Sequence, residues 1–170
     1  IPNGPLSVDA NGNVGIGTTT KTSRLELRGE FVRKIQMVTG LGPNDQTING
    51  RIASRTLIFN KMSSDTFIRI LYCDNIRSYN PTGPASGQWE IRINGIAPAS
   101  GRIYHDFHIN CGGISNIHVP TTILGYAGGI GSGKHEIQVW VGPCTDGWLN
   151  NLWTGWNNSR WTIEAQEVWL

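Results

Sequence analysis

The stretch QWEIRIN at residues 88–94 decides the fold class, because apolar and polar side chains alternate through it. Successive side chains of a β-strand point to opposite faces, so Trp89, Ile91 and Ile93 would share one face. Glu90 and Arg92 would lie on the other, which predicts a strand between a core and solvent. The same alternation occurs at residues 31–38, 65–77, 102–110, 135–141 and 161–168.

Gly, Pro and Asn residues separate these segments, and no segment has the period of an amphipathic helix. The chain of 170 residues contains 22 Gly, and only 15% of its residues are charged, against about 25% in an average globular chain. Short alternating strands with turn residues between them are typical of an antiparallel β-sandwich. The sequence therefore predicts an all-β protein.

The first 29 residues differ from the rest, and we expect a stalk segment at 1–29 and a head domain at 30–170. Asn11-Gly12 is a strong tight-turn signal between two short apolar segments. The few apolar residues of this segment cannot form a core alone, so identical neighbouring chains are the expected partner. The stalk residues expected to pack in this way are Val8, Val14, Ile16, Leu25 and Leu27.

The sequence argues against nucleotide binding, nucleic-acid binding and membrane insertion. GGIGSGKH at residues 128–135 approaches the phosphate-binding loop pattern, but His135 replaces its last Ser or Thr and a strand-like segment follows. A net charge of +2 without a basic run argues against nucleic acid. No apolar run reaches the roughly 18 residues of a membrane helix, so no membrane insertion is expected.

The segment NGNVGIGTTTKTSRLELRG at residues 11–29 resembles an element that precedes the terminal domains of many phage and viral tail-fibre proteins. In those fibres the element forms an intertwined trimeric stalk. The resemblance implies a homotrimer with a short N-terminal β-stalk.

A second set of motifs covers most of the head: SNIH at 115–118, Gly125, GIGSG at 129–133, VWVG at 139–142, Cys144 and TGWN at 154–157. In this order they resemble the C-terminal globular head of the collagen triple helix repeat-containing protein 1 family. That head is similar to the trimeric jelly rolls of the complement-component and tumour-necrosis-factor superfamily. The resemblance implies an antiparallel jelly-roll β-sandwich head that forms a homotrimer.

This sequence departs from that family in two respects. Several disulfide cysteines of the animal proteins are missing, although Cys144 matches, and no Gly-X-Y collagen stalk is present. The disulfide pattern and the signalling partners are therefore not transferred. Trp140 shares its face with Glu136 and Gln138, opposite Ile137 and Val139, so we expect this indole in the trimer interface.

The segment at residues 148–161 holds four Trp among Asn, Thr and Ser. Exposed indoles stack on the apolar faces of sugars, while Asn side chains hydrogen-bond the hydroxyls. Trp148 and Trp153, with Asn150 and Asn151, are therefore the candidate receptor-binding residues. Trp156 and Trp161 are expected to fill the core or a subunit interface.

No catalytic residue is expected, and no cofactor. The carboxylates Glu90, Glu136, Glu164 and Glu167 are interpreted as solvated positions, and the cysteines Cys73, Cys111 and Cys144 as small buried side chains without an identifiable Cys–His pair.

The metal ligands are unknown. His105 and His108 would point to opposite faces of one strand, so they cannot share an ion, and His118 is interpreted as a structural hydrogen-bonding residue. A single ion on the threefold axis is left open.

The expected function is adhesion: the chain would be the distal receptor-binding head of a trimeric viral or phage fibre. Its partner would be a host cell-surface receptor, with a glycan as the favoured class. The head would lie on the virion surface or otherwise be extracellular. Two alternatives stay open, a structural cap that trimerises a fibre and a secreted extracellular matrix or signalling head.

Overall fold

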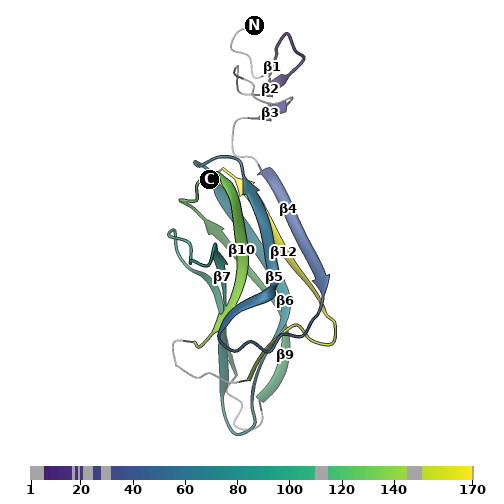
Figure 1. Ribbon diagram of the computed structural model, residues 1–170, viewed down its shortest axis with the longest axis vertical. Helices are drawn as coiled ribbons and strands as arrows, with labels where there is room; N and C mark the ends of the chain where they lie inside the picture. The colour runs from purple at the N-terminus through teal and green to yellow at the C-terminus, as the bar shows by residue number, and fades with distance from the viewer. Residues whose placement is uncertain are drawn as a thin grey trace.

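The computed structural model describes residues 6–16, 18, 20, 25–27, 32–109, 115–144 and 151–169. Twelve β-strands occur in these ranges, and no helix does, so the described part holds no helix that could cross a membrane. Figure 1 shows a β-sandwich head with a small group of strands beyond one end. The all-β expectation is confirmed.

The head consists of two antiparallel sheets. The β5 sheet has the order β5-β10-β7-β8, with β5 at Gly50–Lys61, β10 at Gly133–Gly142, β7 at Ala85–Ile93 and β8 at Ile103–Ile109. The β6 sheet has the order β11-β6-β12-β4, with β11 at Asn151–Thr154, β6 at Phe67–Asn80, β12 at Arg160–Val168 and β4 at Val32–Leu41, and β9 at Ser115–Ala127 also pairs with β6.

Successive strands of the head cross between the two sheets, from β4 to β5, β5 to β6 and β6 to β7. This connectivity is consistent with the expected jelly roll. The strands at Gly50–Lys61, Ser115–Ala127 and Asn151–Thr154 were not predicted. The loop at 128–132 joins β9 of one sheet to β10 of the other, and strand conformation follows its glycines, as predicted.

The core lies between the two sheets and follows the alternation in the sequence. Trp89 and Ile91 of β7 are fully buried, as predicted, while Arg92 lies on the opposite face. Ile68, Ile70 and Tyr72 of β6 face them from the other sheet. Burying such side chains contributes on the order of 1.5–3 kcal/mol each, which makes these faces the main source of head stability.

The stalk contains β1 at Leu6–Val8, β2 at Val14–Ile16 and β3 at Leu25–Leu27. β1 and β2 form the predicted hairpin, and Gly12 in its turn has φ +77°, a conformation that favours glycine. β3 runs parallel to β2.

Among the expected stalk residues, Val8 and Ile16 are exposed and Val14 is half-buried, whereas the side chains of Leu25 and Leu27 lie outside the described residues. Their packing against sister chains and the domain boundary near residue 29 stay predictions.

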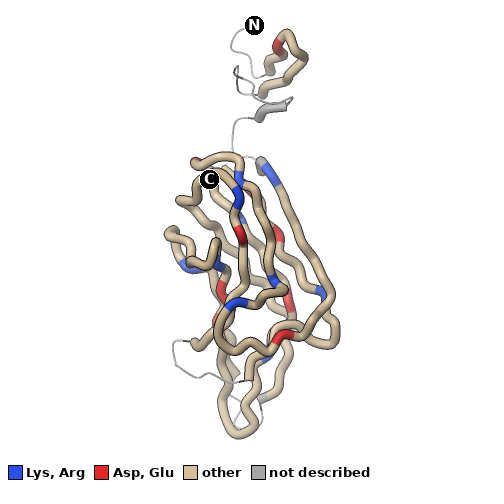
Figure 2. The backbone as a smooth tube through the Cα atoms, viewed as in Figure 1, with Lys and Arg blue, Asp and Glu red and all other residues tan. Residues whose placement is uncertain are grey.

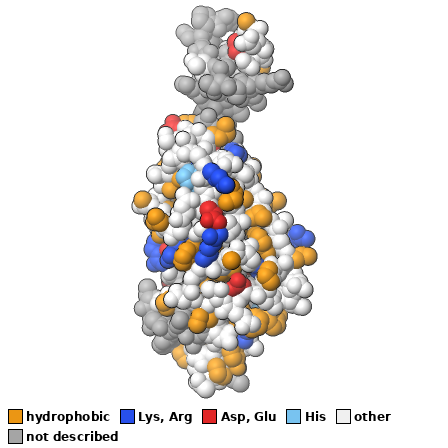
Figure 3. Space-filling view, in the orientation of Figure 1, with side chains coloured by type: hydrophobic (Ala, Val, Ile, Leu, Met, Phe, Trp, Pro, Cys, Tyr) orange, Lys and Arg blue, Asp and Glu red, His pale blue; other side chains and the backbone are white. Residues whose placement is uncertain are grey.

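Charges of both signs are spread over the head. Figure 2 shows basic and acidic positions interspersed along the strands of the head. Figure 3 shows basic and acidic side chains next to one another over the middle of the face that carries β5 and β10. An ion pair between Arg51 of β5 and Glu136 of β10 lies on this sheet.

Candidate functional site

Figure 1 shows β9 at the end of the head away from the stalk, and β6 pairs there with both β9 and β11. In the strand register, Arg77 of β6 lies opposite both Trp153 of β11 and His118 of β9. Paired residues point to the same face of a sheet, so these side chains project together from the outer face of the β6 sheet. We call the set the distal aromatic cluster: Arg77, Tyr79, Asn116, His118, Asn151, Trp153 and Trp156.

The rings of the cluster are in mutual contact. The Trp153 and Trp156 rings lie 5.4 Å apart in an edge-to-face arrangement, and the His118 ring lies 4.1 Å from Trp156. The Arg77 guanidinium lies 5.0 Å from the Trp153 ring centre and 4.8 Å from that of Tyr79. Trp156 is 40% exposed, so the cluster presents an aromatic surface to solvent.

Amide side chains border the rings. Arg77 Nε donates a hydrogen bond of 2.6 Å to Asn116 Oδ1, and the Trp153 indole N–H donates to Asn151 Oδ1. The side chains of Asn116 and Asn151 are exposed. Each Asn amide has both donors and an acceptor, which allows it to bind further hydroxyl groups.

The electrostatics of the cluster are set by burial and by one cation. Burial lowers the pKa of His118, and the nearby positive charge of Arg77 lowers this pKa further. Burial also lowers the pKa of Arg77, an effect that Tyr79 opposes. His118 is therefore neutral at neutral pH.

We expected His118 to be a structural hydrogen-bonding residue, and this expectation is wrong for its Nδ1 atom. Its Nδ1 is buried and has no hydrogen-bond partner within the described ranges, so the ring is held by stacking on Trp156 instead.

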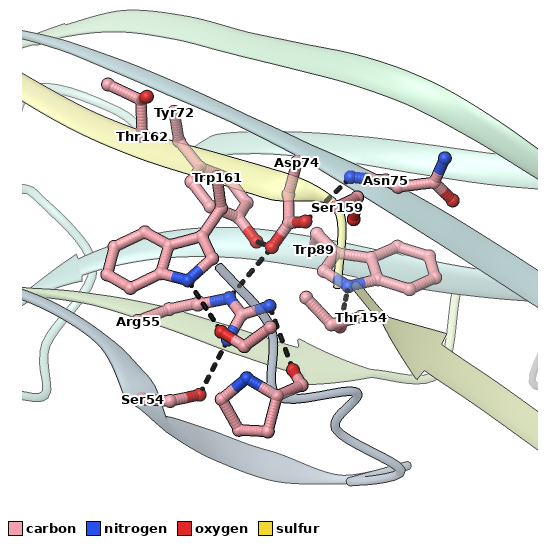
Figure 4. A network of polar contacts seen from close by, with 12 residues as sticks. Ser54, Arg55, Tyr72, Asp74, Asn75, Trp89, Thr154, Ser159, Trp161 and Thr162 are labelled. Carbon is pink, nitrogen blue, oxygen red and sulfur yellow. Dashed lines mark hydrogen bonds and ion pairs between the residues drawn. The ribbon is translucent and has the colours of Figure 1, made fainter. Parts of the chain in front are cut away.

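A buried polar network supports the turn that carries Trp156. Figure 4 shows Arg55 beside Asp74, with both side chains fully buried and an Nε–Oδ2 distance of 2.8 Å. The same guanidinium donates to the carbonyls of Gly42 at 2.9 Å and Pro43 at 3.1 Å. The Trp161 indole also donates to Gly42 O, at 2.8 Å. The network thus holds the segment after β4 against the start of β12.

The network also constrains the end of β11. Thr154 accepts a hydrogen bond from the Trp89 indole at 2.7 Å, and the Gly155 amide donates to Asn75 O at 2.7 Å. Gly155 has φ +77°, and a Cβ there would lie 2.6 Å from an Arg55 nitrogen. Only glycine fits this position, so the network fixes the turn that presents Trp156.

Two of the four candidate receptor-binding residues, Trp153 and Asn151, lie together in this cluster. Trp148 and Asn150 lie outside the described residues. Trp161 is 7% exposed, which confirms its place in the core. Trp156 is 40% exposed and therefore does not lie in the core, and its expected alternative place in a subunit interface stays a prediction.

Sequence reasoning missed Arg77, Tyr79 and Asn116. Arg77 and Tyr79 belong to the alternating run of β6, so their shared face could have been predicted, but not which residues would lie beside them.

Trp140 lies at a second surface feature, on the outer face of the β5 sheet. Its ring centre is 4.4 Å from the Arg92 guanidinium, and its indole donates to Gln138 Oε1 at 3.0 Å. It borders a hollow of about 260 Å³, which is lined by Asn49, Gln88, Glu90, Arg92, Arg102, Trp140, Val141, Gly142 and Pro143. The proposed role of Trp140 in a trimer interface stays a prediction.

Two of the carboxylates that we expected to be exposed to solvent are buried. Glu167 is fully buried and accepts hydrogen bonds from the amides of Met62 and Ser63, both at 2.8 Å, so it anchors a turn. Glu90 is buried beneath Arg92 and Arg102. Burial alone would raise the pKa of Glu90, but hydrogen bonds from these two arginines hold it below its usual value.

The cysteines also differ from one another. Cys144 is buried, as expected, whereas Cys73 is half-exposed on the outer face of β6, where its sulfur lies 3.2 Å from the Thr122 hydroxyl. Cys111 lies outside the described residues. The fold brings Cys144 close to His108, a proximity that the sequence did not indicate.

A protein-family model described as CTHRC1, C-terminal domain, matches residues 33–163, which is more than half of the chain. The chain belongs to this family. The match confirms the resemblance of the head, and it begins after the stalk, so the likeness of the stalk to tail fibres is not tested. The family is one of secreted, extracellular domains, which agrees with the expected extracellular location.

Proposed function

We propose that this protein is an extracellular carbohydrate-binding head of the secreted matrix or signalling type. The family match supports this alternative more than the viral or phage fibre tip, because the match lies in the head, whereas the viral interpretation depends on the stalk motif alone. Binding of a glycan remains the expected chemistry under either interpretation.

The observation that carries the proposal is the exposed aromatic surface of the distal aromatic cluster. Trp153 and Trp156 offer two indoles at an angle to each other, which suits stacking on the apolar face of a sugar ring. Asn116 and Asn151 lie beside them with amide groups for the sugar hydroxyls. Arg77 is only 7% exposed, so its positive charge acts from beneath the rings, where it favours glycans that carry a carboxylate or sulfate over neutral ones.

The composition of the cluster favours binding over catalysis. Glycoside hydrolysis requires two carboxyl groups about 5–9.5 Å apart, and none of the seven residues of the cluster is acidic. The proposal therefore includes no bond-breaking step.

We further propose that the head functions as a homotrimer. Ile35 and Met37 of β4 are 57% and 60% exposed, and Leu124 and Tyr126 of β9 are exposed on the same outer face of the β6 sheet. Packing against a second copy of the chain would remove these side chains from water. Three weak glycan sites on one assembly would then bind with avidity.

The test is a glycan array probed with the intact protein and with Trp153→Ala and Trp156→Ala. Each substitution is expected to weaken binding roughly 5- to 150-fold, if a sugar face stacked on an indole contributes as much as a stacked nucleic-acid base, on the order of 1–3 kcal/mol. Tyr104→Ala is the control, because Tyr104 is an exposed aromatic residue on the other sheet that has no expected role in assembly, and its glycan binding should be unchanged. No binding by the intact protein to any glycan would refute the proposal.

Native mass measurement of the same variants separates recognition from assembly. If Trp153→Ala or Trp156→Ala yields monomers while the intact protein is trimeric, the indoles belong to the subunit interface, and the cluster is not the glycan site.

A further inference from the structure

We propose that Asp106, His108 and Cys144 form a binding site for a divalent zinc-type cation. One ligand atom from each residue, namely a carboxylate oxygen, an imidazole nitrogen and the Cys144 sulfur, can be chosen so that all three lie within 4.8 Å of one another. These three ligand types are those that zinc prefers. The site is distinct from the distal aromatic cluster, because its residues belong to β8 and to the segment just after β10 of one sheet, whereas the cluster is on β6, β9, β11 and the turn after β11 of the other.

The fold explains how three residues distant in sequence converge. Asp106 and His108 are two positions apart on β8, so their side chains point to the same face. Cys144 follows the end of β10, which lies on the other side of β7 from β8 in the same sheet. His105, by contrast, is directed to the opposite face of β8, which agrees with the expectation that His105 and His108 cannot share an ion.

One neighbour, Gln88, orients a ligand of the proposed site, while the Arg102 guanidinium also interacts with Asp106 and competes there with a bound cation. Gln88 of β7 donates a hydrogen bond of 2.6 Å to Asp106 Oδ1, and Gln88 is itself in contact with Arg102. Such second partners orient ligating carboxylates and raise metal affinity. Cys144 is 5% exposed and His108 is exposed, so the cation would be held between the interior and solvent, with a position open to water.

A catalytic Cys–His–Asp triad explains the arrangement of these three residues less well than a metal site does. In a nucleophile–base–acid series, the imidazole lies between the sulfur and the carboxylate and keeps them apart. Here the sulfur and a carboxylate oxygen themselves lie within 4.8 Å, as expected for atoms that surround a common centre. Bound metal distances of about 2.0–2.3 Å would need only a small further approach of the three atoms.

The test is titration of the full, reduced and chelator-treated protein with Co²⁺, followed by displacement with Zn²⁺. Sulfur–cobalt charge-transfer absorption should appear at one equivalent and disappear as Zn²⁺ is added. It should be lost in Cys144→Ser and strongly reduced in His108→Ala, and it should persist in the controls Cys73→Ser and His105→Ala. Gln88→Leu should weaken zinc affinity about 10–100-fold, because Asp106 then loses its orienting hydrogen bond.

Three results would overturn the proposal. The first is the absence of sulfur–cobalt absorption in a correctly folded protein. The second is equal Co²⁺ binding by the intact protein and Cys144→Ser, which would show that the sulfur is not a ligand. The third is a disulfide at Cys144 in the isolated, unreduced protein, detected by mass spectrometry of its peptides, because a bonded sulfur is not available as a thiolate ligand.

Discussion

Replacing Asp74 by Asn is expected to destabilise the head by about 3–5 kcal/mol, because it leaves the Arg55 charge buried without a counter-ion. Both side chains are fully buried, so water cannot compensate the lost charge. The Asp74 carboxylate also accepts hydrogen bonds from the Tyr72 hydroxyl at 2.8 Å and from the Asn75 amide at 2.7 Å. An Asn amide cannot accept at both of its terminal atoms, so at least one of these donors loses its partner.

A loss of about 3–5 kcal/mol is large compared with the total free energy of unfolding of a domain, which is about 5–15 kcal/mol. Glu136→Gln is the matched control, because it removes a charge from the ion pair with Arg51, whose partners are 36% and 33% exposed. That exposed pair should contribute no more than about 1 kcal/mol. The double variant Arg55→Met/Asp74→Leu should be more stable than Asp74→Asn, since neither charge is then buried, but it should not reach the stability of the intact protein, because the Tyr72 hydroxyl and the Pro43 carbonyl lose their partners.

The assay is urea unfolding followed by tryptophan fluorescence, at one fixed protein concentration because assembly contributes to apparent stability. If Asp74→Asn costs no more than Glu136→Gln, the buried pair does not support the fold and the reasoning is refuted. Glycan binding by Asp74→Asn should also weaken, because Arg55 contacts the turn that presents Trp156.

Two further predictions concern the same region. Gly155→Ala should destabilise the head by roughly 1–3 kcal/mol in the same urea assay, because φ is +77° and the new Cβ would meet Arg55, whereas Gly131→Ala, with open space around it, should have a much smaller effect. The pKa of His118 is lower in the folded protein than in the unfolded chain, so protons bind the unfolded chain more readily. The stability that the neutral His118 contributes is therefore fully present above about pH 6.5 and is lost as the pH falls further. The difference in unfolding free energy between the intact protein and His118→Phe should therefore change between about pH 7.5 and 5, and a pH-independent difference would contradict the cause assigned to this pKa.

The alternation along the chain predicted most strands of the head, although not β5, β9 and β11, and in the predicted strands it also indicated which side chains face the core. Trp89, Ile91 and Ile93 could be assigned to one face from seven residues, because that assignment depends only on the local geometry of a strand. The hairpin at Gly12 followed from local turn chemistry in the same way.

The candidate site was only partly predictable. Trp153 and Asn151 were identified because indoles and amides near one another in sequence are typical of sugar-binding loops. The partners Arg77 and His118 lie 33 or more positions from Asn151 and Trp153 and 41 positions from each other, and no local pattern indicates that their strands are neighbours.

The sequence alone therefore determined the all-β class, the core-facing positions and the motifs of the family, because each depends on residues close together in the chain. Only the tertiary structure decided which outward-facing residues meet. The order of strands in a jelly roll is set by contacts between distant segments, and this order joins His118 to Trp156 and Asp106 to Cys144. It also buries Glu90 and Glu167, which the sequence placed in solvent, because neighbouring strands and turns supply their hydrogen-bond partners.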